Sequence, residues 1–406
     1  MIRHFFRCWV LLMFCFLVGC GAQPPAATSS SSAAAASKPV TLAPVTDEQA
    51  LAFAETLTKS VYGESDAQSS VDWSRLIDRA ALGLEMKPKS LEAFRKGVMQ
   101  SMVTNGLGSQ IQAQIKLGAS YKRLRTHQTP EGTRVTMRLL LAGGGVNYHD
   151  YLLASESGNV SAVDINLASV GEDMSATFRR LMIPLVARDN RGFLDRLSGT
   201  ESLFIKHSGE LERASKMIQG GQPETALQVL NALPLEMQNE KFVLVMQIGA
   251  AQLAGNDASV LAAIERFRSQ FPTDPATALY SIDYYITRKE FLKAIEALEQ
   301  LKTAVGGDAE LDTMIANVRL EAGDIPGAKV AIEQAIAREP DLPSSYWSKI
   351  SVALTEDDHA TTLATLIHLK SELNIALSAE SLKTEVLYSK FVLSPEFQEL
   401  EEFLAE

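Results

Sequence analysis

The sequence predicts an α+β domain followed by an all-α region that is built from repeated helix pairs. Amphipathic segments with helical spacing come before segments in which apolar and polar residues alternate, and this order is typical of an α+β domain. In the second half, small, aliphatic and glycine residues return at one constant interval without an insertion. We therefore expect the α+β domain at 47–205, the repeats at 206–390 and a terminal cap at 391–406.

The first 20 residues have the pattern of an export signal. Arg3 and Arg7 precede an apolar run from Cys8 to Val18, which is too short to span a bilayer as a helix. The segment Leu17-Val18-Gly19-Cys20 then resembles the lipobox of bacterial lipoproteins. This resemblance implies that residues 1–19 are removed and that Cys20 carries lipid. An ordinary secretory signal and a lone anchoring helix are the alternatives.

Lipid on Cys20 would attach the protein to a membrane, because two or more acyl chains bind a bilayer stably. Gly21 follows the cysteine, where an aspartate would resemble the inner-membrane retention signal. We therefore expect an outer-membrane location that faces the periplasm. Residues 20–46 are rich in Pro, Ser and Ala and cannot bury a core, so we expect a disordered tether there.

Composition argues against several function classes. The chain has a net charge of -11, which becomes -13 without the two arginines of the signal. An acidic chain is a poor binder of nucleic acid. Cys8 and Cys15 lie in the signal, so a lipidated Cys20 would leave no free thiol and no disulfide. The six histidines lack metal-ligand spacing, and no P-loop or nucleophile elbow occurs. We expect no enzyme activity, metal or cofactor.

The predicted α+β domain begins with three helices. Thr46-Asp47-Glu48-Gln49 looks like a capping box that opens the first helix. The second contains Trp73, and the third starts after Pro88. After Gly118 the hydrophobic period changes to two, which predicts three or four antiparallel strands. The clearest alternation consists of Val135, Met137, Leu139 and Leu141.

The segment from Asn147-Tyr148-His149-Asp150-Tyr151 through Val163-Asp164-Ile165-Asn166 resembles the nuclear transport factor 2-like family, which has a cystatin-like roll. The resemblance implies a cone-shaped cavity and, in some members, a small ligand, polyketide cyclase-like catalysis or a homodimer formed through the sheet. Tyr148, His149 and Asp164 are the candidate cavity residues. Alternation places His149 and Tyr148 on opposite faces of a strand. A structural role for these polar residues is the alternative, and it is the stronger one.

Three kinds of position recur at the same interval in the second half, and no insertion interrupts them from His207 to Arg338. They are Gly221, Gly255 and Gly323, with Lys289 as the exception; Ala226, Ala294 and Ala328, with Val260 in the missing place; and Leu230, Ile264, Leu298 and Ile332. The interval matches the period of tetratricopeptide repeats, about 34 residues, and the pattern resembles that family. A fifth, degenerate unit starts at Pro343, and an amphipathic segment after Pro395 is the predicted cap.

The resemblance to tetratricopeptide repeats implies that the first helix of each repeat holds peptides or partner proteins. The candidate contact residues occupy two positions of the repeat. The first position gives Leu211, Val245, Leu279, Thr313 and Trp347, and the second gives Asp283 and Asn317. We expect a membrane-anchored scaffold that binds envelope proteins or peptides. The alternative is a small-ligand-binding or catalytic roll in which the repeats serve assembly.

Overall fold

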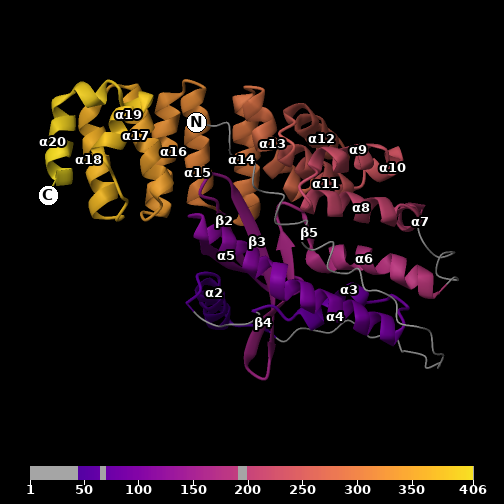
Figure 1. The fold of residues 1–406 in the computed structure, drawn as a ribbon. Coiled ribbons are helices and arrows are strands. Elements are labelled where there is room, and N and C mark those ends of the chain that lie inside the picture. The colour runs from indigo at the N-terminus through magenta and orange to yellow at the C-terminus, as the bar shows by residue number, and fades with distance from the viewer. Residues whose placement is uncertain (1–43, 65–69, 191–198, 406) are drawn as a thin grey trace. The chain divides into compact units, whose positions relative to one another are not determined.

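The computed structural model describes residues 44–64, 70–190 and 199–405. Cys20, the signal and nearly all of the expected tether lie outside the described residues. The chain forms two compact units, one up to Tyr280 and the other from Ser281, and Figure 1 colours the chain by residue number. The first unit contains the sheet domain together with the first helices of the region expected to be repetitive. Its end therefore lies well beyond the expected boundary at residue 205.

Four helices precede the sheet. They are α2 (Asp47–Val61), α3 (Trp73–Ala81), α4 (Pro88–Asn105) and α5 (Leu107–Lys116). The capping box is confirmed, because the Gln49 amide donates to the Thr46 side chain and the Thr46 amide donates back to the Gln49 side chain. A fourth helix exists because Gly106 separates α4 from α5. A Cβ at Gly106 would lie 2.3 Å from the carbonyl oxygen of Met102, so the tight break requires glycine.

The sheet has five strands, and each one pairs antiparallel with the next along the chain. The strands are β1 (Ser120–Thr129), β2 (Gly132–Leu140), β3 (Val146–Glu156), β4 (Asn159–Leu167) and the short β5 (Glu172–Asp173). The order of helices followed by a meander is thus confirmed, with one short strand more than expected. Register shifts interrupt the ladder at Arg123/Arg125 and at Leu152/Leu153, and such irregularities bend a strand.

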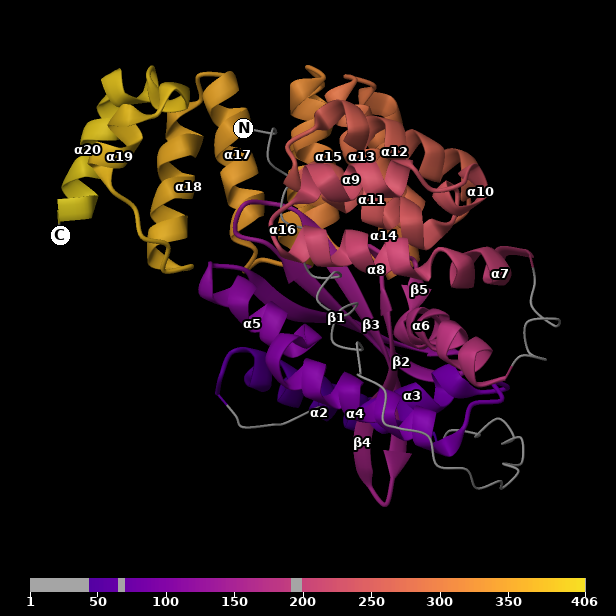
Figure 2. The same cartoon turned by 45° about the vertical axis from the view of Figure 1, so that its right-hand side comes forward.

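Aromatic side chains join the helices to the sheet. Phe53 of α2 lies 5.8 Å from the Tyr151 ring of β3, measured between ring centroids, so α2 covers the face of the sheet to which Tyr151 belongs. The helix α6 (Met174–Asp189) follows β5, and its Phe178 packs edge-on against Phe94 of α4. Figure 2 shows α2, α3 and α4 together beside the strands, with the β3–β4 hairpin projecting past them.

Helices form the rest of the chain. They are α7 (Gly199–Lys206), α8 (Ser208–Gln219), α9 (Pro223–Asn231), α10 (Leu235–Gln238), α11 (Lys241–Leu253), α12 (Asp257–Gln270), α13 (Pro275–Thr287), α14 (Phe291–Val305), α15 (Ala309–Glu321), α16 (Ile325–Arg338), α17 (Pro343–Thr355), α18 (His359–Ser371), α19 (Ala379–Thr384) and α20 (Pro395–Ala405), with short 3-10 turns at Val386–Tyr388 and Phe391–Leu393. None of the helices in the described part of the chain has the length and apolar character that a membrane span needs.

The turn inside each helix pair has one shared backbone conformation. Gly221, Gly255 and Gly323 have φ values of 72°, 64° and 80°, in the left-handed region. The two residues in register with them, Lys289 and Asp357, also have positive φ values of 58° and 57°. The recurring glycines therefore mark a real backbone requirement, and Lys289 meets it at a steric cost.

The second unit ends in an apolar cluster that α18, α20 and the 3-10 turns share. Leu366, Phe391, Phe397 and Leu400 are fully buried there. Trp347 of α17 packs against the same cluster and is half-buried. The terminal segment after Pro395 thus covers apolar surface of the preceding helices, as expected for a cap.

Candidate functional site

Most of the predicted partner-contact residues are buried. Leu211, Val245, Leu279 and Thr313 have at most 5% of their surface exposed. These four residues cannot contact a partner in this conformation, so their assignment to an open surface was wrong. In α11 and α15 the physical reason is that more than one side of the helix is covered: ten of the thirteen residues of α11 and nine of the thirteen of α15 are buried, which an amphipathic pattern alone does not predict.

Asp283, Asn317 and Trp347 remain partly accessible. Burial raises the pKa of the Asp283 carboxyl to about 7, because desolvation disfavours its charged form. Asn317 accepts a hydrogen bond of 2.7 Å from the Ser348 hydroxyl through its side-chain oxygen. Trp347 contributes to the C-terminal cluster. Asp283 and Asn317 are therefore the predicted contact residues that still offer polar groups at a surface.

The three predicted cavity residues do not converge. Tyr148, His149 and Asp164 are all buried. His149 shares a face of the sheet with Tyr151, whereas Tyr148 lies on the other face, as the alternation predicted. Asp164 pairs with Leu152 of β3, which places it on the face opposite His149. A single cavity lined by all three side chains is therefore excluded in this conformation.

His149 belongs to a buried chain of hydrogen bonds. The Tyr121 hydroxyl lies 3.0 Å from His149 Nδ1 and 2.8 Å from the Tyr151 hydroxyl. His149 Nε2 has no hydrogen-bond partner within the described residues. Burial lowers the pKa of His149 to about 3, since the imidazolium form would lose its hydration. The ring is thus neutral near pH 7 and is bound by Tyr121, which also bonds to Tyr151, on the face that α2 covers.

Asp164 joins β4 to two helices. Its carboxylate accepts hydrogen bonds from the backbone amide of Ser175 at 3.1 Å and from Arg79 Nε at 3.2 Å, and the Ser175 hydroxyl donates to it as well. Ser175 lies in the first turn of α6, where free amides favour an anion. Burial and nearby Asp173 raise the pKa of Asp164, whereas Ser175 and Arg79 act in the opposite direction. These contacts link β4 to α3 and α6.

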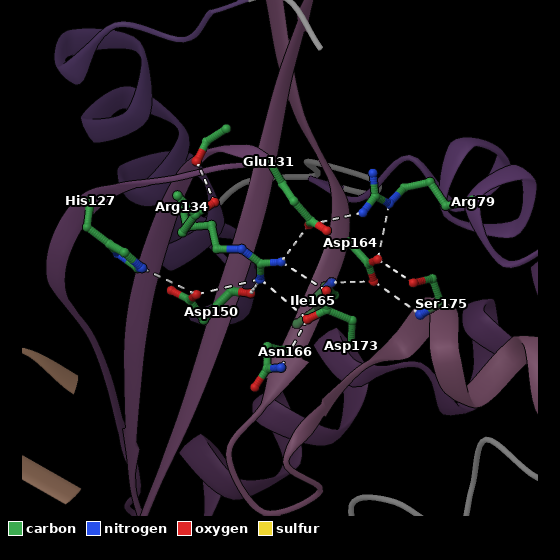
Figure 3. A network of polar contacts seen from close by, with 12 residues as sticks. Arg79, His127, Glu131, Arg134, Asp150, Asp164, Ile165, Asn166, Asp173 and Ser175 are labelled. Carbon is green, nitrogen blue, oxygen red and sulfur yellow. Dashed lines mark hydrogen bonds and ion pairs between the residues drawn. The ribbon is translucent and has the colours of Figure 1, made fainter. Parts of the chain in front are cut away.

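A polar network surrounds Arg134 of β2, as Figure 3 shows. Arg134 Nη2 lies 2.9 Å from the Asp173 carboxylate and 3.3 Å from the Glu131 carboxylate. Its Nη1 lies 3.6 Å from the Asp150 carboxylate. Glu131 also pairs with Arg79 at 3.2 Å, which connects the Arg134 network to Asp164. These carboxylates raise the pKa of Arg134 despite its burial.

The Arg134 network borders an open pocket of about 550 Å³. The lining residues are Thr129, Pro130, Glu131, Arg134, Asp150, Asn166 and Asp173. His127 Nε2 lies 3.6 Å from the Asp150 carboxylate at the edge of this network, and burial is the main cause that lowers the pKa of His127. Within the described residues, no cluster of His, Cys, Asp or Glu could hold a metal ion. The arrangement can position a cationic group against the carboxylates.

Sequence reasoning found only part of this network. Asp150 belongs to the segment that resembles the nuclear transport factor 2-like family, whereas Arg134, Glu131 and Asp173 were not predicted. Arg134, Asp150 and Asp173 meet only because β2, β3 and β5 are brought together by the sheet. No known protein family, curated protein or solved structure matches this chain.

Proposed function

We propose that this protein is a lipid-anchored scaffold of the bacterial outer membrane that faces the periplasm and binds envelope proteins through tetratricopeptide repeats. One observation carries the proposal. The second helices of five successive pairs begin at residues 223, 257, 291, 325 and 359, so the interval between them is the same each time. A constant period of about 34 residues is characteristic of tetratricopeptide repeats.

The packing inside each unit supports the repeat assignment. In the first unit, α9 packs against both α8 and α11. In the second unit, α16 packs in the same way against α15 and α17. A second helix that lies between two successive first helices buries the apolar face of both, which is how stacked repeats share their cores. Ala226, Ala294 and Ala328 are fully buried at the position that permits this close approach.

For the α+β domain we propose a supporting role in a cystatin-like roll rather than catalysis. The sheet is a meander that follows four helices, which is consistent with such a roll. The residues with catalytic potential lie on opposite faces of the sheet, and Asp164 is fully engaged by Arg79 and Ser175. A general acid or base must lie within hydrogen-bond distance of a substrate. The contacts of Asp164 with Arg79 and Ser175 leave no room for a substrate beside this carboxylate.

The experiment uses residues 21–406, immobilised and incubated with solubilised envelope proteins. We expect Asp283→Lys to lose at least ten-fold in the capture of a specific envelope protein, because a new charge lies on the proposed partner face. Glu296→Lys is the matched control, since Glu296 is an exposed carboxylate on α14, the second helix of that pair. Asp283→Asn keeps the size of the side chain, so normal capture by this variant checks that a substitution at residue 283 preserves the fold.

Equal capture by the native protein and by Asp283→Lys would contradict the assignment of Asp283 to the partner face.

A separate experiment tests the lipid anchor with the full-length chain expressed in bacterial cells. The native protein should incorporate labelled fatty acid and sediment with membranes, whereas Cys20→Ser should do neither. Labelling of Cys20→Ser would contradict the lipidation site.

A further inference from the structure

The turn between β4 and β5 is held by helices of the proposed repeats. This turn, residues 168–171, is called the β4–β5 turn below. The Tyr280 hydroxyl of α13 donates to the Ser169 carbonyl at 2.5 Å. The Lys241 ammonium of α11 donates to the Gly171 carbonyl at 3.2 Å. Two side chains from different helices thus bind two backbone carbonyls of the turn.

The fit around Gly171 is tight. Gly171 has a φ of +71°, and a Cβ at this position would lie 2.2 Å from Asp274 Oδ1 and 3.1 Å from the Ala276 Cβ. Asp274 accepts from the Ala276 amide at 2.9 Å and also pairs with Lys241. Only glycine can occupy this place without moving the carboxylate, so the helices form a shaped site for a glycine turn.

A second contact extends the same surface. The Arg180 guanidinium of α6 lies 5.5 Å from the centroid of the Phe242 ring and pairs with Glu172 of β5. Phe204 of α7 lies 6.1 Å from the same ring. An aromatic ring that is covered by a cation and by another ring is a desolvated contact of the kind that dominates interfaces.

The register places these contacts on the face that the proposed function assigns to partners. Phe242 and Ala276 are separated by one repeat interval, so they occupy the same position in successive first helices. Val245 and Leu279 follow three residues later on the same helix face, and both are buried. The β4–β5 turn and α6 therefore contact the first residues of this face, at Lys241, Phe242 and Ala276, together with Tyr280.

We propose that the β4–β5 turn is an intramolecular ligand that occupies the partner face of α11 and α13, so that a partner binds there only when the turn leaves. This inference rests on the proposed repeat function. A competing partner would present a glycine turn with free backbone carbonyls, because Lys241 and Tyr280 both donate hydrogen bonds there. The contact of the β4–β5 turn with Lys241 and Tyr280 thus inhibits partner binding to α11 and α13.

The test uses residues 21–406, which keep Val45 and Thr46, and a labelled peptide with the sequence of residues 166–173. Gly171→Val should displace the β4–β5 turn and increase peptide binding at least ten-fold, measured by fluorescence anisotropy. Gly158→Val is the matched control, because Gly158 also has a positive φ, of 86°, but a Cβ there meets nothing within 4 Å. Adding Lys241→Ala to Gly171→Val should return binding to the native level.

A folded Gly171→Val protein that binds the peptide no better than the native protein would overturn the inference. A second measurement uses the native protein. The peptide and the turn compete for the same donors, so an increasing peptide concentration should speed hydrogen exchange at residues 168–171, and a scrambled peptide should not. Equal exchange with both peptides would also overturn it. Neither readout needs the envelope partner, so the two proposals fail separately.

Discussion

The α+β domain and the helical region use different kinds of contact. In the α+β domain, polar contacts join residues that are far apart in the chain: Arg79 and Asp164 are separated by 85 residues, and Thr133 bonds to the Val45 carbonyl over 88. In the second unit, Lys302 and Arg338 pair with Asp312 over 10 and 26 residues. The second unit is therefore held by contacts within and between neighbouring helix pairs, whereas the α+β domain depends on partners that are far apart in the chain.

The largest expected effect follows from replacing Asp164, a buried long-range partner in the α+β domain. Asp164→Ala removes a buried carboxylate and leaves Arg79 and the Ser175 amide without it, so we expect a loss of about 3 kcal/mol in the free energy of unfolding. Chemical denaturation followed by tyrosine and tryptophan fluorescence measures this loss. Glu131→Gln, whose side chain is 51% exposed, should cost less than about 1 kcal/mol. Similar losses in both variants would contradict the structural role of Asp164.

Acid should destabilise the α+β domain through His149. Its pKa is about 3 in the folded protein and about 6.5 when unfolded, so only the unfolded chain binds the proton between these values. The stability is fully present above pH 6.5 and falls by about 1.4 kcal/mol per pH unit toward pH 3.

Denaturation at pH 7.0 and pH 5.5 measures the effect, with His149→Gln as the comparison. The difference between the native protein and this variant isolates His149 from Asp164, whose raised pKa acts in the opposite direction. If the native protein and His149→Gln lose the same stability on acidification, the imidazole is not the group responsible.

The smallest effect concerns a turn of the helical region. Lys289→Gly should raise the free energy of unfolding by roughly 0.5–1 kcal/mol, because a left-handed lysine costs more than the added freedom of glycine in the unfolded chain. Thermal unfolding of residues 21–406 measures the gain. Gly255→Lys, the reverse change at the equivalent turn, should lower the melting temperature. A destabilised Lys289→Gly protein would show that the lysine side chain matters more than its backbone conformation.

Several elements were predictable because their causes are local. The capping box at Thr46, the alternation of β2 and the left-handed turn at Gly221 each depend on residues within a few positions of one another. The burial of Val245 and Leu279 was not predictable, because an apolar residue on a helix face can be covered by a partner or by another part of the same chain. The Arg134 network was missed for the same reason, since its carboxylates come from separate strands.

The sequence by itself determined the position of each helix pair, the type of turn within it and the order of helices before strands, because hydrophobic period and backbone preference act over short distances. Only the tertiary structure decided which faces are open. It placed the β4–β5 turn against Lys241 and Tyr280, separated His149 from Asp164 and gathered the carboxylates around Arg134. Burial is a property of the folded chain, since it depends on which distant segments come to cover a surface.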